Sequence, residues 1–446
     1  MADVLTIALA TLCTLLPFWL AGRQGLVAWV SPMHLLGYFC ALGFWAKVVA
    51  YAVAPDLAFY ARFDPAAGAG LRGAIYLGGF IVLICLGYLL ACKPVSVAQQ
   101  ISTTRAVAAG VQQIGLLAAI ALAVTALTML LILRARGDDI GEAGLIAAVN
   151  HSKQINVNAD GVGATLAGIK TLFIVPKFAF VLCLAQTILQ PRPALILLTG
   201  ALAAALVAAA LMSGDRFALV DLAVYVLATH ALLGGRLGWR QVGLGLGLAA
   251  AMVALSAYMT QLRLGADGAK ILHQIIGSTY FLDINVAVMV TDRVTPGQLL
   301  LGQSYGWWVF GWIPRGYWPD KPAVDLGVYL KREVMGVATG GAFNVTGPGE
   351  AFLNFGWAGL AVAPLTGWMF RKGEAFLLDP SRNARLGTAF VYPLLFYPLV
   401  RTCLQSSFSA FVVAAAVQLV LIIGLRALFI RRLRWRFHHV ERISHA

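Results

Sequence analysis

The chain has 446 residues, of which 60% are hydrophobic and 12% are charged. Soluble globular domains carry about 25% charged residues, so this composition excludes an ordinary soluble domain and indicates an integral membrane protein. The formal net charge of +14 does not indicate a nucleic-acid partner, because the basic residues fall mostly between hydrophobic runs and in the C-terminal tail. Charge in those places is typical of membrane topology and of contact with anionic lipid headgroups.

The first hydrophobic run resembles a signal peptide in length but not in its charges. It is preceded by Asp3 and by no basic residue, and its first positive charge, Arg23, follows the run. Signal peptides carry their positive charge before the apolar run. The order seen here favours a retained first helix with the N-terminus outside the cytoplasm.

Hydrophobic runs long enough to cross a membrane recur along the chain. Since a crossing needs roughly 20 apolar residues, we predict an all-α polytopic membrane protein with about eleven spans. The predicted limits are 3–22, 26–53, 74–92, 107–133, 165–189, 194–212, 217–235, 242–262, 349–370, 387–402 and 408–429. The chain is thereby divided into spans one to eight at 1–262, a large outer loop at 263–348, spans nine to eleven at 349–430 and a basic cytoplasmic tail at 431–446.

The connectors of this topology differ between the two sides. Those on the cytoplasmic side are short and mostly basic, and they lie at 22–26, 93–105, 190–193, 235–241 and 371–385. Those outside are longer, mixed in charge and rich in Gly, Asn and Asp. Positive charge collects on the cytoplasmic side of membrane proteins, so the C-terminus is predicted to be cytoplasmic and the functional surface to lie outside.

The large outer loop has the composition of a membrane interface, with tryptophan and tyrosine alternating with glycine and proline between Tyr305 and Trp318. Before this region, Asp267–Asp292 has apolar residues at roughly helical spacing, with Lys270, His273 and Asp283 at polar positions. The segment is too short and too polar to cross a membrane. We predict amphipathic helices that lie along the outer surface.

Four cations on the outer side need an explanation, since topology disfavours positive charge there. They are Arg216, Arg315, Lys321 and Arg401. One interpretation is local pairing, of Arg216 with Asp215 and Lys321 with Asp320, or contact with lipid headgroups. The other is a clamp for a diphosphate, because guanidinium groups bind phosphate oxygens through paired, charge-assisted hydrogen bonds.

Glu350 opens the ninth predicted span in the sequence TGPGEAFLNFG. A carboxylate is stabilised at a helix N-terminus, which is one sufficient reason for its place. The alternative is a general base that orients or deprotonates an acceptor group. Gly347 and Gly349 would let the backbone pass close to a ligand.

Neither cysteine nor histidine forms a metal pattern. The six cysteines lie in or beside apolar runs without a CxxC pair, and the seven histidines show no HExxH. The outer segments also lack a paired-aspartate ligand set. We therefore predict no disulfide framework, no metal and no other cofactor.

Several outer segments together resemble the Wzy-type oligosaccharide repeat unit polymerases, the O-antigen and exopolysaccharide polymerase family. The likeness lies in IPRGYWPDKP, in TGPGEAFLNFGWAGL and GWMFRK after it, in SGDRFALVDL and in RTCLQSS, and it covers roughly residues 205–410. The resemblance implies a GT-C-like glycosyltransferase that joins undecaprenyl-diphosphate-linked oligosaccharides at the periplasmic face of the bacterial inner membrane. It implies catalytic roles for Glu350, Arg315 and Arg401, and diphosphate binding by these two arginines with Arg216 and Lys321.

The implied partners are the lipid-linked oligosaccharide, membrane lipids and, in the same pathway, a chain-length regulator and a flippase. Two alternatives stay open. An O-antigen ligase-like enzyme would move a glycan between lipid carriers by related chemistry. A transporter for lipid or solute would also have many spans and a few charges, although the large one-sided loop and the lack of paired, interrupted helices argue against it.

Overall fold

The computed structural model describes residues 2–91, 96–134, 171–213, 217–236, 281–313, 317–318, 326–337 and 342–430, with isolated residues between 238 and 279. The predicted eighth span at 242–262 and the tail at 431–446 lie outside these residues, apart from Gly243, Gly247 and Ala254. The described part is built of helices and contains no strand. Seven of its helical stretches are long and apolar enough to cross a membrane. An all-α polytopic membrane protein is thereby confirmed.

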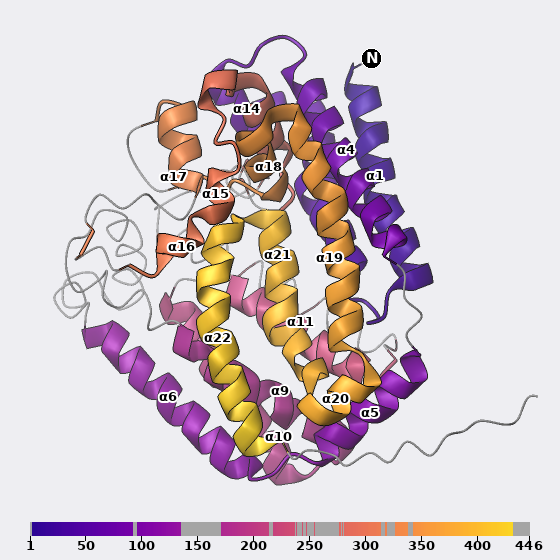
Figure 1. The fold of residues 1–446 in the computed structure, drawn as a ribbon, viewed down its shortest axis with the longest axis vertical. Coiled ribbons are helices and arrows are strands. Elements are labelled where there is room, and N and C mark those ends of the chain that lie inside the picture. The colour runs from indigo at the N-terminus through magenta and orange to yellow at the C-terminus, as the bar shows by residue number, and fades with distance from the viewer. Residues whose placement is uncertain are drawn as a thin grey trace, which may run out of the picture.

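The helices run back and forth between two ends of the molecule (Figure 1). The first half contains α1 (Ala2–Gln24), α2 (Pro32–Cys40), α3 (Ala46–Val53), α4 (Ala69–Leu90), α5 (Val97–Ala109), α6 (Ile114–Arg134), α9 (Ile174–Leu189), α10 (Pro193–Ser213) and α11 (Phe217–Leu232). The second half contains α14 (Ile284–Arg293), α15 (Gln303–Gly306), α16 (Trp308–Gly311), α17 (Leu326–Tyr329), α18 (Gly347–Phe355), α19 (Val362–Leu377), α20 (Pro380–Leu386), α21 (Tyr397–Gln405) and α22 (Phe408–Phe429). The N-terminus lies at the end that carries α14, α17 and α18, whereas α5 and α20 lie at the opposite end.

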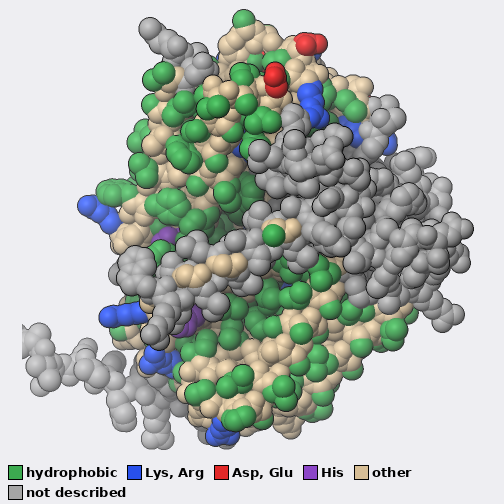
Figure 2. All heavy atoms as spheres, turned by 180° about the vertical axis from the view of Figure 1, so that it is seen from behind, with side chains coloured by type: hydrophobic (Ala, Val, Ile, Leu, Met, Phe, Trp, Pro, Cys, Tyr) green, Lys and Arg blue, Asp and Glu red, His purple; other side chains and the backbone are tan. Residues whose placement is uncertain are grey.

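The helix α4 lies at the centre of one group of helices, and it packs against α1, α14 and α19. A Cβ atom at Gly87 of α4 would lie 1.9 Å from the carbonyl oxygen of Pro364, and one at Gly367 of α19 would lie 1.9 Å from that of Ile84. The backbones of α4 and α19 therefore touch, as small residues allow between membrane helices. Hydrophobic side chains are spread over the whole described face in Figure 2, with few charged side chains among them. These features fit a bundle surrounded by lipid.

The predicted fourth span at 107–133 is wrong at its beginning. The chain turns at Gly110–Gln113, where Gln113 has φ +51°, and only α6 continues as the span. The preceding connector forms α5, whose polar side chains hold the ends of other helices. Asn383 donates to the Thr104 hydroxyl at 2.9 Å, and Arg105 donates to the Leu233 carbonyl at 2.7 Å.

The predicted ninth span at 349–370 is interrupted. Gly356 has φ +59° and ends α18, after which a 3-10 segment at Gly356–Ala361 leads into α19. The second helix then continues to Leu377, into the predicted cytoplasmic connector. There the Arg371 guanidinium is buried, and it donates to the Gln24 carbonyl and the Tyr88 hydroxyl. The break makes α18 a short helix confined to one end of the molecule.

The helix α14 occupies the described part of the predicted surface helix at Asp267–Asp292. Its residues from Ile284 to Val290 are all buried, and it packs on α4 and α18. Asp283, expected at a polar position, is fully buried instead. Its carboxylate caps α14 by accepting the Asn285 N–H at 2.7 Å, and it forms an ion pair with Lys47 of α3. The sequence pattern predicted that Asp283 faces solvent. In the buried position, the Lys47 ammonium compensates the charge of its carboxylate.

Candidate functional site

Two of the five predicted site residues, Glu350 and Arg401, lie in the described part of the chain. Arg216, Arg315 and Lys321 lie outside it, so their predicted roles stay predictions. Glu350 belongs to α18, which lies at the end of the bundle that carries α14, and Arg401 belongs to α21, which packs against α18. Our topology places this end outside the cytoplasm. Each residue belongs to a separate cluster of polar side chains.

Glu350 lies in the first turn of α18, where the Thr346 hydroxyl caps the helix by accepting the Gly349 N–H. Its side chain is buried, and each carboxylate oxygen accepts a hydrogen bond. The Ser304 hydroxyl donates to one oxygen at 2.9 Å, and the backbone N–H of Phe408 donates to the other at 2.8 Å. Since Phe408 is the first residue of α22, the carboxylate lies at the N-termini of two helices.

One helical turn further along, Asn354 extends these contacts. Its amide donates to the Ser304 hydroxyl at 2.7 Å and accepts the Gly302 N–H at 2.9 Å. Ser304 and Asn354 are fully buried. We call Ser304, Glu350, Asn354 and Phe408 the Glu350 network. Sequence reasoning did not single out Ser304 or Asn354, although the i, i+4 spacing of Glu350 and Asn354 places both on one helix face.

Tyr305 shields this network. Its ring stacks on Phe355 at a centroid distance of 6.3 Å and meets Phe408 edge-on. Burial raises the pKa of the Tyr305 hydroxyl well above its usual range, and the nearby Glu350 carboxylate raises it further. The phenol is therefore protonated at any physiological pH.

The glycines before Glu350 serve a purpose other than the predicted one. A Cβ at Gly347 would lie 1.7 Å from the carbonyl oxygen of Cys403, and one at Gly349 would lie 2.8 Å from the Val286 side chain. The close approach is therefore made to α21 and α14 and not to a ligand. These glycines dock the N-terminus of α18 against two other helices.

Arg401 of α21 forms an ion pair with Asp221 of α11. The Lys177 ammonium, from α9, lies 3.8 Å from the second oxygen of the same carboxylate. Arg401 has no acidic residue beside it in the sequence, and its partner Asp221 comes from a distant helix. We call Lys177, Asp221 and Arg401 the Asp221 cluster.

Sequence reasoning missed Lys177 and Asp221. Each is the only Asp, Glu, Lys or Arg residue of its helix, and so is Arg401 of α21. Single charges inside apolar helices were the available signal, because such residues in membrane proteins turn inward and pair with one another.

Glu350 and Arg401 both lie beside α21. The N-terminus of α18 touches α21 at the Cys403 carbonyl, and Arg401 of α21 pairs with Asp221 of α11. Burial raises the pKa of the Cys403 thiol, and the Glu350 carboxylate lies close enough to raise it further. The Glu350 network and the Asp221 cluster are therefore neighbours along α21.

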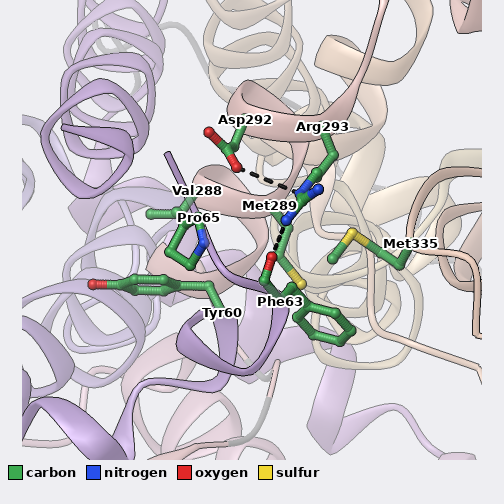
Figure 3. Close-up of a pocket in the computed structure, with 8 residues that line it drawn as sticks. All are labelled: Tyr60, Phe63, Pro65, Val288, Met289, Asp292, Arg293 and Met335. Carbon is green, nitrogen blue, oxygen red and sulfur yellow. Dashed lines mark hydrogen bonds and ion pairs between the residues drawn. The ribbon is translucent and has the colours of Figure 1, made fainter. Parts of the chain in front are cut away.

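A small pocket near α14 does not fit a substrate. It is lined by Tyr60, Phe63, Pro65, Val288, Met289, Asp292, Arg293 and Met335 (Figure 3). Its volume of about 10 Å³ holds roughly one water molecule. Arg293 donates to the Phe63 and Asp64 carbonyls, and Asp292 pairs with Arg72 at 2.8 Å. These contacts fasten the segment before α4 onto α14.

Within the described residues, no three His, Cys, Asp or Glu side chains are placed to hold a metal ion. The five cysteines described there are all free thiols. A scan against protein-family models, a search of the curated proteins and a search of the solved structures each found no match to this chain. The class that the structure itself defines is an all-α, multi-pass membrane protein.

Proposed function

We propose that this protein polymerises undecaprenyl-diphosphate-linked oligosaccharide repeat units by glycosyl transfer at the periplasmic face of a bacterial inner membrane. The polymerase-like segments of the sequence support the reaction. The observation that carries the proposal is the Asp221 cluster, which gathers two cations from separate helices inside an apolar bundle. Cations held in that way suit the charge of a lipid-linked diphosphate.

In the proposed reaction the bond between the anomeric carbon of the growing glycan and the lipid diphosphate breaks. A bond forms between that carbon and a hydroxyl oxygen of a fresh lipid-linked unit. The diphosphate leaves with the bonding electron pair, and the hydroxyl proton passes to a base. Arg401, with Arg315, Arg216 and Lys321 in support, offsets the charge that develops on the leaving diphosphate.

The base in this scheme is Glu350, and its contacts narrow how it would act. The Phe408 N–H is a fixed backbone donor, whereas the Ser304 hydroxyl rotates and can turn to another acceptor. The acceptor sugar hydroxyl would therefore take the place of the Ser304 hydroxyl on Glu350. In this role Glu350 orients the acceptor before it takes the proton.

Purified protein in lipid, incubated with undecaprenyl-diphosphate-linked oligosaccharide, tests the proposal on a gel. We expect a ladder of products that differ by one repeat unit. Transfer of a single glycan to a different lipid-linked acceptor would favour the ligase-like alternative. Chelation of divalent metal should leave the ladder intact, and its loss with recovery on added Mg²⁺ or Mn²⁺ would contradict metal-independent catalysis.

A transporter is the second candidate, and one helix break favours it. A 3-10 segment that begins at Gly356, with φ +59°, separates α18 from α19. Interrupted helices and internal ion pairs are typical of transport pathways. Movement of the lipid-linked oligosaccharide across vesicle membranes without polymer formation would support this candidate against the polymerase.

The orientation of the chain is part of the same proposal, because a periplasmic reaction requires the Asp221 cluster to lie toward the periplasm. We expect the N-terminus outside and the C-terminus inside. A reporter fused after Ala446 that is active only in the periplasm would contradict this orientation.

A further inference from the structure

The ion pairs of the Asp221 cluster are weak evidence for a role in stability alone. Burying charge in a membrane helix is unfavourable, and apolar side chains of similar volume generally stabilise a core as well as a buried ion pair does. Yet α9, α11 and α21 each bring their one acidic or basic residue to the same place. Such convergence is the pattern of a binding site.

The exposure of the three side chains is unequal. The side chain of Asp221 is 6% exposed, whereas the side chains of Lys177 and Arg401 are each 24% exposed. The carboxylate is thus enclosed, and the two cations face outward from it. Two cations thus surround one carboxylate. Such an arrangement favours an anion as the ligand.

The position of the cluster agrees with a ligand that reaches it from the outer membrane surface. Lys177 and Asp221 lie in the first two turns of α9 and α11, and Arg401 lies in the last turn or so of α21. In our topology all three of these helix ends are outer ends. The headgroups of lipids, and the diphosphate of a lipid-linked sugar, lie at that depth.

We propose that Lys177 and Arg401 together bind a phosphate-bearing anion, and that Asp221 is the positioning residue that holds the two cations side by side. Arg401 supplies planar N–H donors that match phosphate oxygens, and Lys177 supplies a compact point charge. The inference rests on the proposed function for its substrate, a lipid diphosphate. A phospholipid headgroup offers the same chemistry.

The test is the thermal stability of the purified full-length chain in lipid nanodiscs, titrated with inorganic pyrophosphate. A ligand that binds the folded state raises Tm, and the midpoint of the rise reports its affinity. In phosphatidylcholine nanodiscs we expect pyrophosphate to raise the Tm of the wild type. Lys177→Gln should weaken the affinity about tenfold, the loss of one charge-assisted contact, and Lys177→Arg should restore most of it.

Asp221→Asn should also weaken pyrophosphate binding, because Arg401 and Lys177 lose the carboxylate that orients them. Asp221→Glu should recover part of it. A purely structural role for Asp221 would lower Tm without changing the affinity. Should Lys177→Gln fail to fold, Lys177→Met fills similar space without charge and serves in its place.

The buried pair of Lys47 and Asp283 provides a matched control, since it also joins a lysine to an aspartate from a distant segment. Lys47→Gln should lower Tm and leave the affinity for pyrophosphate unchanged. Equal loss of affinity in Lys47→Gln and Lys177→Gln, or no effect of pyrophosphate on the wild type in any nanodisc, would overturn the inference.

Nanodiscs that contain phosphatidylglycerol distinguish the two sources of phosphate. If the anionic lipid abolishes the effect of pyrophosphate only while Lys177 is intact, the site takes lipid headgroups. If pyrophosphate still binds, the site prefers a diphosphate. If pyrophosphate binding depends on Lys177 but the protein makes no ladder, the anion site is supported and the proposed polymerase activity is contradicted. If Lys177→Gln forms the ladder at the wild-type rate, the polymerase activity is supported and the role of Lys177 in substrate binding is contradicted.

Discussion

The Glu350 network and the Asp221 cluster each contain a buried carboxylate but surround it differently. Glu350 is 2% exposed and receives a hydroxyl and a backbone N–H, both neutral donors. Asp221 is 4% exposed and receives two part-exposed cations. The described donors of Glu350 join α18 to α15 and α22. The donors of Asp221 bring two cations together. The kind of donor around a buried carboxylate therefore indicates its role, whereas burial alone does not.

The largest effect on stability is expected for Asp221→Ala. Removing one member of a buried ion pair leaves an uncompensated charge and costs about 3–5 kcal/mol of unfolding free energy. Lys177→Ala is the matched control, since it leaves the Arg401–Asp221 pair intact and removes a contact of 3.8 Å. We expect its loss to be well under half as large, measured by denaturant titration in detergent. Equal losses would mean that the Lys177 contact, and not the Arg401–Asp221 pair, provides most of the stabilisation.

A smaller effect is expected for Glu350→Ala, which leaves the Ser304 hydroxyl and the Phe408 N–H without their acceptor. An unsatisfied buried donor costs about 1–3 kcal/mol, and the hydroxyl can turn away while the backbone N–H cannot. Thermal unfolding in detergent measures the loss. An unfolding free energy equal to that of the wild type would show that the two donors find other acceptors and that Glu350 does not join α18 to α22.

Glu350→Gln separates the two roles of this residue, because the amide retains one acceptor and the size of the side chain. If the carboxylate acts on the acceptor hydroxyl, turnover in the ladder assay falls while the affinity for the lipid substrate changes little. If it only joins helices, Tm falls and turnover per folded molecule does not. Ser304→Ala is the control for the lost hydrogen bond alone.

Gly347→Ala tests the contact that joins the two sites through α21. The added Cβ would meet the Cys403 carbonyl oxygen at 1.7 Å, so α18 must move. Overpacking of this kind costs about 1–3 kcal/mol. Gly200→Ala in α10 is the control, because nothing lies within 4 Å of its added Cβ and alanine favours a helix. Equal stability of the two variants in thermal unfolding would show that the contact between α18 and α21 is loose.

Hydropathy predicted the all-α membrane architecture correctly, because each crossing requires a long apolar run whatever the tertiary contacts. It failed where local backbone decided the outcome. The turns at Gln113 and Gly356 occur inside apolar runs, and both depend on a positive φ that the hydropathy of the segment does not report. The polar helix α5 was taken for a connector, since one donor to its buried Thr104 is Asn383, which is distant in the chain.

The candidate site was predictable only in part. The motif around Glu350 drew attention to the residue, but Ser304 is 46 positions away along the chain. Arg401 was singled out for lacking an adjacent acid, while its actual partner Asp221 is 180 positions away. Pairing across such separations depends on how helices pack. The remaining sequence signal, a lone charge in an apolar helix, identifies Asp221 and Lys177 but does not say which residues they meet.

The most direct test of the central claim, that Arg401 binds a diphosphate, is the turnover of Arg401→Lys in the ladder assay at matched amounts of folded protein. Lysine can still pair with Asp221 as a point charge, so Tm should stay close to that of the wild type. The planar donors are lost, and a transition-state contact of about 3 kcal/mol corresponds to a fall in turnover of roughly a hundredfold. A hundredfold loss at unchanged Tm is the predicted result. Polymer formed by Arg401→Lys at the wild-type rate would contradict it.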